Sequence, residues 1–202
     1  MKKLIGFFLI LLSISSCQED EKPLQTSGLT EADQTTLLYM REEEKLAHDI
    51  YINAFDKYGV LAFQNIATSE TKHIEAVLNA MNRYQVTDPL NGSTDVGEFT
   101  IPEIQDLYLQ LLEKVNESQN EALLVGLLIE DLDIYDLENA IAETNNTTLS
   151  FLYENLKCGS MNHMRSFESL ASLSSLIYTP IYISQSEYES IISSPRTSCN
   201  NQ

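Results

Sequence analysis

Apolar side chains recur at spacings of three and four residues through four long stretches of this 202-residue chain. Such a spacing places them along one face of an α-helix, whereas no stretch alternates for long enough to indicate a β-strand. Turn-forming residues are also few, with 7 glycines and 5 prolines, which argues against a β-sandwich or barrel. The pattern therefore predicts an all-α fold.

Capping and turn residues predict where these helices begin and end. Thr30 is a suitable N-cap for the first helix, Gly59 is a stop after it, and Pro102 suits the first turn of an extra helix. Two short connections, and a long one that carries the extra helix, predict a four-helix bundle with ferritin-like connectivity. The long helices are expected at residues 30–58, 61–84, 118–144 and 147–174, with shorter ones at 102–115 and 184–192.

The first sixteen residues have the layout of a bacterial export signal. Two lysines precede an apolar run at residues 4–12, which is too short to span a bilayer and argues against a membrane helix. The sequence ISSC at residues 14–17 resembles a bacterial lipobox, so Cys17 is expected to carry lipid and to become the mature N-terminus. Residues 1–16 are then a cleaved signal peptide, and residues 17–28 a flexible acidic tether.

Lipid on Cys17 would anchor the bundle domain, residues 29–192, and its tail, residues 193–202, in the cell envelope. Gln18, rather than aspartate, follows Cys17 and favours the outer membrane. The acidic residues at 19–21 resemble the signal with which some bacteria move lipoproteins to the cell surface. An anchored chain also favours a monomer or a homodimer over a mineral-storing cage.

The chain is strongly acidic, with 30 Asp and Glu against 12 Lys and Arg and a net charge of −18. So anionic a protein repels phosphate groups, which argues against nucleic acid as a partner, and it attracts metal cations. Composition therefore favours metal cations over nucleic acids as partners.

Acidic and histidine residues interrupt each apolar seam near its middle. With a rise of ~1.5 Å per residue, Glu44 and His73 lie about equally far from the turn that joins their helices. Glu130 and His163 lie nearly equally far from theirs, and Glu70 stands one helical turn before His73. Buried carboxylates cost several kcal/mol unless compensated, and a shared metal pair would compensate all of them. The alternative is a solvated Glu70 beside a packed His73.

Four blocks of the sequence resemble the signature segments of an uncharacterised prokaryotic family. They are LYMREEEKLA at 38–47, NIATSETKH at 65–73, VGLLIEDLDI at 125–134 and GSMNHMRSF at 159–167, with a similar tail, Tyr178-x-Pro180-x-Tyr182-x-Ser184. On these blocks, residues 28–192 resemble the domain of unknown function 2202, a ferritin-like family. The resemblance implies a ferritin-like bundle but no established activity.

Ferritin-like di-iron proteins supply one glutamate from each of two helices and a Glu-x-x-His pair from each of the other two. By position, the resemblance implies these ligands for iron or manganese: Glu44, Glu70, His73, Glu130 and His163. Ser160 departs from the pattern, because it stands where the second pair would have its glutamate. Asp133 replaces that carboxylate if its side chain turns into the bundle. Otherwise the site holds one ion, binds weakly or binds none.

Other polar residues near the seams are weaker candidates. Glu43 takes the place of Glu44 if the helix phase is off by one residue. Glu42 is expected to face solvent, and His48 to lie at the rim of the bundle. Arg165 is expected to pair with a bundle carboxylate. The tyrosines expected in the core are Tyr51, Tyr108 and Tyr153.

Two cysteines, Cys158 and Cys199, remain once Cys17 is lipidated. In an oxidising envelope they are candidates for a disulfide that joins the last long helix to the tail, worth roughly 3–4 kcal/mol. Alternatively, Cys158 is a small buried apolar residue.

The sequence supports three functional hypotheses. The leading one is a ferritin-like metalloprotein that oxidises ferrous iron or reduces peroxide, with enzyme activity left open. The second is a non-enzymatic bundle that sequesters metal or binds a partner in the envelope. The third is a lipid-tethered adhesin or component of a surface complex.

Overall fold

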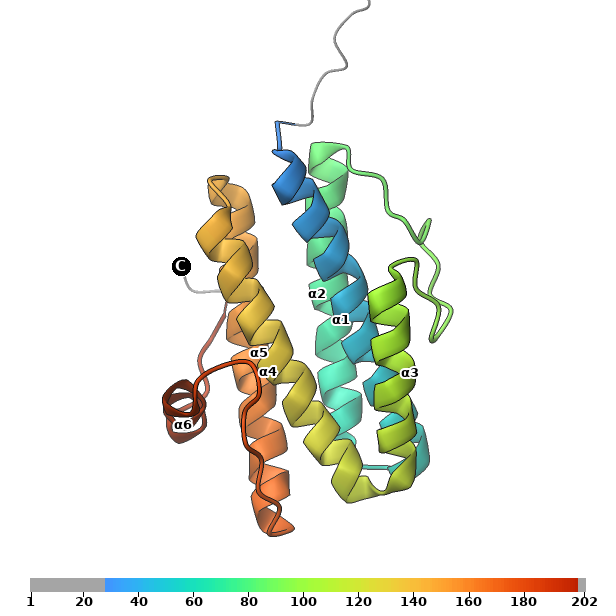
Figure 1. Ribbon diagram of the computed structural model, residues 1–202, viewed down its shortest axis with the longest axis vertical. Coiled ribbons are helices and arrows are strands. Elements are labelled where there is room, and N and C mark those ends of the chain that lie inside the picture. Colours follow the sequence, from blue (N-terminus) through green and yellow to red (C-terminus); the bar gives the residue numbers. More distant parts are fainter. Residues whose placement is uncertain (1–27, 200–202) are drawn as a thin grey trace, which may run out of the picture.

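The computed structural model describes residues 28–199 (Figure 1). Within that range the chain forms six α-helices and no strand, which confirms the all-α prediction. None of these helices combines the length and the apolar character needed to cross a membrane. The expected signal peptide and the lipid on Cys17 lie outside the described residues. The helices are α1 (Glu31–Tyr58), α2 (Leu61–Tyr84), α3 (Pro102–Glu117), α4 (Gln119–Glu143), α5 (Thr147–Leu173) and α6 (Gln185–Ser193).

Local side-chain chemistry fixes the ends of these helices. Thr30 and Asp33 form a capping box at the start of α1, in which each side chain accepts a hydrogen bond from the other residue's backbone N–H. Gly59 ends α1 at a φ of 67°, a left-handed conformation that glycine adopts without steric cost. Ser118 and Asn146 accept backbone hydrogen bonds at the starts of α4 and α5. The helix ends thus agree with the sequence-based ranges to within about two residues, the usual uncertainty of a helix boundary.

The long helices form two hairpins that pack side by side. The helix α1 packs most extensively on α2, and α4 on α5, while α1 meets α4 and α2 meets α5 across the interface between the hairpins. The helix α3 follows the long connection after α2 and lies against α1 and α4 (Figure 1). The α1–α4 and α2–α5 contacts are therefore on opposite faces of the bundle.

The apolar core is divided into two parts along the long axis of the bundle. Within residues 28–199, the buried apolar side chains fall into two clusters. One contains Phe63 and Phe167, and the other contains Leu37 and Tyr153. Polar residues from all four long helices lie between these clusters, so the interruption seen in each seam is a continuous polar layer in the folded chain.

Two expectations about polar residues were wrong. Glu42 is fully buried rather than solvent-facing, and it accepts hydrogen bonds from the backbone N–H groups of Thr100 and Ile101 at 2.8 and 3.0 Å. The long connection covers α1 there, a tertiary contact that helix periodicity does not reveal. Among residues 28–199, Arg165 pairs with no carboxylate but donates to the backbone oxygens of Ile191 and Ser194, at 2.9 and 3.1 Å. It thereby holds the C-terminal end of α6.

Asp131 fastens the segment between α5 and α6 to the bundle. Its buried carboxylate accepts hydrogen bonds from the Tyr178 hydroxyl at 2.7 Å and from the backbone N–H groups of Ile181, Tyr182 and Ile183 at 2.6 to 3.1 Å. Hydrogen bonds to a charged acceptor are the strong ones, so one side chain organises the return of the chain across α4.

We expect Asp131→Ala to lower the free energy of unfolding by about 3 kcal/mol or more, because each hydrogen bond to a charged group is worth about 1.5–3 kcal/mol. Urea denaturation measures the change. Asp106→Ala, at an exposed position on α3, is the control and should alter stability only slightly. An equal effect of the two substitutions would contradict this role of Asp131.

Candidate metal centre

Five of the expected ligand residues converge in the polar layer. Glu44 comes from the middle of α1, Glu70 and His73 from successive turns of α2, Glu130 from α4 and His163 from α5. Each carboxylate residue is 2% exposed. In the described part of the chain they form two groups with the spacing of metal ligands, Glu44–Glu70–His73 and Glu70–Glu130–His163. Glu70 belongs to both groups.

The carboxylate of Glu70 lies between two imidazoles. Its Oε2 is 2.8 Å from Nδ1 of His73, and its Oε1 is 2.8 Å from Nδ1 of His163. Each imidazole faces a second carboxylate: Glu44 Oε2 is 3.0 Å from His73 Nδ1, and Glu130 Oε2 is 3.5 Å from His163 Nδ1. The two rings stack with their centroids 5.4 Å apart. The arrangement has approximate two-fold symmetry, and Glu70 belongs to both halves.

Asp133 turns into the bundle beside this cluster. It is 6% exposed, and its Oδ2 accepts a hydrogen bond from the hydroxyl of Ser160. Ser160, the position where the di-iron pattern has a glutamate, therefore holds a carboxylate from the neighbouring helix. Asp133 lies next to the two ligand groups but belongs to neither of them.

The histidines and Glu70 stabilise each other's charged forms. Burial by itself lowers the pKa of His163, but the carboxylates of Glu70 and Glu130 outweigh burial and raise this pKa to about 10. For Glu70, burial acts to raise the pKa, and the two imidazoles outweigh it and hold the pKa well below its ordinary range. Glu70 is thus held in its ionised form.

The other acids of the layer are pushed toward their neutral forms. Burial raises the pKa of Glu44 to about 7, although His73 opposes the shift. Burial, followed by the carboxylates of Glu44 and Glu130, raises the pKa of Asp133 well above its ordinary value. Glu43 is also buried, and Asp133 adds to the effect of burial in raising its pKa. Without a cation, this layer must retain protons that the unfolded chain would release.

The donor atoms fit a cation. Glu44 Oε1, Asp133 Oδ1 and His163 Nδ1 are buried and have no hydrogen-bond partner within residues 28–199. His163 Nδ1 lies close to two carboxylates but without the geometry of a hydrogen bond, so its lone pair or proton points elsewhere. Ligand atoms about 3 Å apart are what adjacent positions around an ion with bonds of ~2.1 Å require. Carboxylate oxygens with two imidazoles form a suitable set for iron or manganese.

Neighbouring side chains fix the orientation of the cluster. The hydroxyl of Tyr51 donates to Glu130 Oε1 at 2.6 Å, while its ring packs on Phe167 with the centroids 5.1 Å apart. Gly159 leaves room for His73, because a Cβ there would meet His73 Nε2 at 2.5 Å. Sequence reasoning missed this role of Gly159. The available signal was a glycine inside a helix, which costs about 1 kcal/mol relative to alanine.

The weaker candidates occupy other places. Glu43 is buried against α4, near Asp133 and Asp136, rather than in either ligand group. His48 is partly exposed, and its Nδ1 lies 2.9 Å from Asp49. The three tyrosines expected in the core are buried: Tyr51, Tyr108 and Tyr153.

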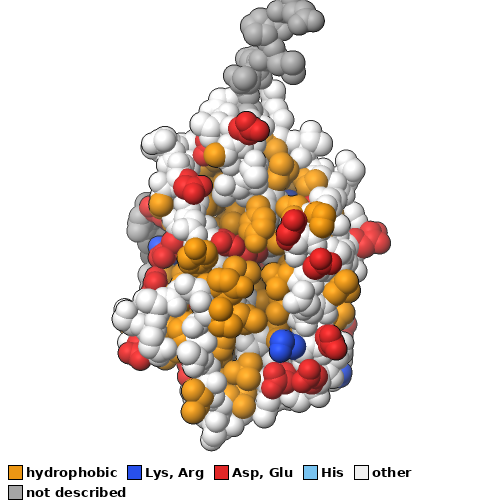
Figure 2. Space-filling view, in the orientation of Figure 1, with side chains coloured by type: hydrophobic (Ala, Val, Ile, Leu, Met, Phe, Trp, Pro, Cys, Tyr) orange, Lys and Arg blue, Asp and Glu red, His pale blue; other side chains and the backbone are white. Residues whose placement is uncertain are grey.

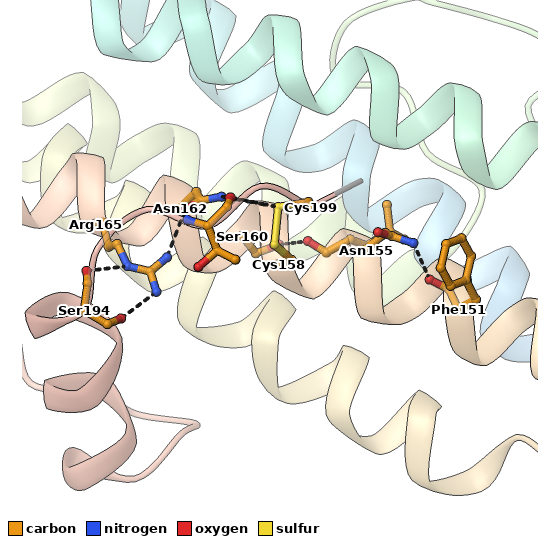
Figure 3. Close-up of a disulfide and its surroundings, with 10 residues drawn as sticks. Phe151, Asn155, Cys158, Ser160, Asn162, Arg165, Ser194 and Cys199 are labelled. Atoms are coloured by element: carbon orange, nitrogen blue, oxygen red, sulfur yellow. Dashed lines mark hydrogen bonds between the residues drawn. A yellow bond between two sulfur atoms is a disulfide. The ribbon is translucent and has the colours of Figure 1, made fainter. Parts of the chain in front are cut away.

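Cys158 and Cys199 form a disulfide in the structure, with their Cα atoms 5.6 Å apart (Figure 3). The bond joins α5, one residue before Gly159, to the tail of the chain. It lies on the α2–α5 side of the polar layer, close to His73 and His163.

A family model described as "Uncharacterized protein domain (DUF2202)" matches residues 33–195. The chain belongs to the DUF2202 family. "Uncharacterized protein MJ0754" of Methanocaldococcus jannaschii is 45% identical over 171 residues, which cover 85% of this chain and 92% of the archaeal protein. The crystal structure of hypothetical protein MJ0754 from Methanococcus jannaschii DSM 2661 superposes with a TM-score of 0.82 at 44% identity, covering 84% of this chain and 96% of that one. These similarities establish the family of this chain and its helical fold.

We expect the metal-free DUF2202 protein to lose stability steadily as pH rises from about 5 to about 10. The pKa of Glu44 goes from 4.5 to about 7 on folding, and that of His163 from 6.5 to about 10. The folded chain thus binds more protons than the unfolded chain across this range, so the free energy of unfolding falls with pH.

Urea denaturation of the metal-free protein at a series of pH values measures this slope. His163→Gln should make the free energy of unfolding less dependent on pH above about pH 6.5. Below that pH the dependence should stay as in the wild-type protein. Stability that rises between pH 5 and 10 would contradict proton retention by the cluster.

Proposed function

We propose that this DUF2202 protein is a ferritin-like metalloprotein of the bacterial cell envelope that holds one or two iron or manganese ions. One observation carries the proposal: side chains of metal-ligand type from all four long helices meet in a buried layer, with Glu70 between two imidazoles. A set of buried acids and histidines that share one carboxylate has no evident role in packing, because an apolar layer of the same size would cost nothing to bury.

The bundle supports the ferritin-like part of the proposal. Ferritin-like bundles have one long crossover connection between two helical hairpins, and they carry their metal ligands on facing helices. Here the connection from α2 to α4 is the long one, it contains α3, and the cluster lies at the interface of the hairpins. The ligand order is also that of the di-iron pattern, except at Ser160.

The side chains around the cluster prepare it for a redox metal. Bound iron or manganese would supply redox chemistry in which ferrous iron gives up electrons and dioxygen or peroxide accepts them. The two apolar clusters cover the layer on two sides, and Tyr51 holds Glu130 in place through its O–H. Glu44 and His163 would release their protons as a cation binds, so binding is favoured as pH rises.

Ser160 favours a second candidate function, the sequestration of metal without turnover. With a serine at this position, the second half of the cluster has one carboxylate fewer than the di-iron pattern, and Asp133 is already engaged by the serine hydroxyl. A cluster short of one carboxylate compensates the charge of two ions less well, and a single bound ion lacks the pair that two-electron chemistry uses.

The location in the envelope rests on the expected lipid at Cys17. The strong net charge of −18 agrees with it, because an anionic protein stands off an anionic membrane and collects cations. On the face seen in Figure 2, acidic side chains clearly outnumber basic ones. A tethered monomer or homodimer would intercept iron or peroxide outside the cytoplasm.

Reconstitution with ferrous iron under anaerobic conditions, followed by elemental analysis, tests the metal site directly. We expect one to two ions per chain, and we expect His73→Ala or His163→Ala to remove at least one of them, because each takes away an imidazole. The matched control is His48→Ala, which lies outside both ligand groups and should retain the metal of the wild-type protein.

Metal content that stays far below one ion per chain would overturn the metalloprotein function. If iron is bound, stopped-flow mixing with dioxygen and with peroxide separates the two candidates. Oxidation no faster than that of free iron would favour sequestration over catalysis.

We further expect Gly159→Ala to weaken metal binding by about 10- to 100-fold while the fold persists, because the added Cβ displaces the His73 ring. Competition with a chelator measures the affinity, and thermal unfolding measures the fold. The control is Gly126→Ala, whose Cβ would press on Phe167 at 2.9 Å rather than on a ligand. It should lower stability more than metal affinity, and the reverse ranking would contradict the role of Gly159.

A further inference from the structure

A cleft of about 670 Å³ opens between α2 and α5, on the face opposite to the α1–α4 contact. His73, His163 and Gly159 form its inner end, so it leads to the imidazole side of the polar layer. Its volume falls within the roughly 300–1,000 Å³ that is usual for small-molecule sites. Nothing in the proposed metal chemistry requires a cleft of this size.

The charge of the cleft is opposite to that of the protein. Among the described residues that line it there is no Asp or Glu, although the chain has 30 of them. It contains Lys72 and Arg196, two of only 12 basic residues. Apart from the two imidazoles, the rest of the polar lining consists of uncharged amides and hydroxyls: Asn65, Thr68, Ser69, Asn155, Asn162 and Thr197.

The tail of the chain is built into one wall of this cleft. The side chain of Asn162 donates to the backbone oxygen of Thr197 at 2.9 Å and accepts from its N–H at 3.1 Å. The Cys158–Cys199 disulfide fixes the tail covalently beside Asn162, as Figure 3 shows. Arg196 therefore follows a defined path along α5, where one of its guanidinium nitrogens donates to Ser166 at 2.5 Å.

We propose that this cleft binds a small hydrophilic oxyanion, a molecule with a phosphate or carboxylate group, through Lys72 and Arg196. A guanidinium has five N–H donors and an ammonium three, so both can contact the anion while Arg196 keeps its bond to Ser166. The amides of Asn65 and Asn155 supply further donors, since Asn155 uses only one of its two N–H groups, on the Phe151 oxygen. The described lining residues include no Phe, Tyr or Trp, the larger rings on which a nucleobase would stack. The strongly anionic remainder of the protein disfavours a large polyanion, which leaves a small one.

The position of the cleft gives the anion a route to the metal centre. Its inner end is formed by the two imidazole residues, so a bound anion would lie next to the centre without replacing Glu44 or Glu130. Any role of the anion in the metal reaction rests on the proposed function. Binding of the anion does not rest on it, because the anion contacts side chains of the cleft.

Titration calorimetry with inorganic phosphate and, separately, with succinate tests the proposal at constant ionic strength. Both the metal-free and the iron-loaded protein are titrated. We expect saturable binding of one anion per chain to both forms, weakened at least about tenfold by Lys72→Gln or Arg196→Gln. Whichever of the two anions binds more tightly shows whether the site prefers phosphate or carboxylate.

Charge-matched controls separate local contacts from net charge. Lys114→Gln on α3 and Lys157→Gln, whose ammonium pairs with Glu138, remove the same charge away from the cleft and should leave binding unchanged. The double variant Cys158→Ser with Cys199→Ser should weaken binding less than Arg196→Gln, because the tail keeps its hydrogen bonds to Asn162. Its metal content should equal that of the wild-type protein.

Three results would overturn the proposal. They are no binding of either anion at millimolar concentration, binding that Lys72→Gln and Arg196→Gln leave intact, and binding to the iron-loaded protein alone without dependence on these two residues. The last result would mean that the anion ligates the metal directly. If metal fails to bind but the anion binds through Lys72 and Arg196, the cleft site stands and the metalloprotein function falls.

Discussion

The structure depends on one arrangement of charges, in which the carboxylate of Glu70 lies between the imidazoles of His73 and His163. The arrangement crosses the interface between the hairpins and divides the apolar core into two clusters. A layer of this kind is expensive to bury unless its charges are balanced, and the balance comes either from retained protons or from a cation. Neighbouring groups hold that layer in one geometry. The Tyr51 hydroxyl donates to Glu130, and Gly159 leaves space for the His73 ring.

Much of the fold could be predicted because the relevant signals are local. Caps such as Thr30, stops such as Gly59 and the apolar seams depend on residues near in sequence, and they place the helices well. The candidate ligands could also be found, since each interrupts an apolar seam at a height that follows from residue counting. The convergence of Glu44, Glu70, His73, Glu130 and His163 therefore needed only helix geometry, together with the resemblance to the DUF2202 family.

Interactions between segments distant in sequence were the ones that could not be predicted. Glu42 is buried because the long connection folds over α1, and Arg165 meets the end of α6 rather than a carboxylate. The register of α4 against α5, which brings Ser160 to Asp133, likewise has no signature in either helix alone. The α2–α5 cleft depends on the path of the tail, and the tail is placed by side chains such as Asn162 whose partners lie more than thirty residues away.

The division into two hairpins has a consequence for how the chain folds. Each hairpin joins neighbouring helices through a short turn, and such local contacts form early and fast. Docking of the hairpins comes later, and it brings Glu44 and Glu70 from one half against Glu130 and Asp133 from the other. Four carboxylates then approach one another as water leaves, so the docking barrier rises or falls with the supply of positive charge. We therefore expect protons or cations to enter the folding pathway as the two halves assemble, so that their supply affects how fast the native state forms.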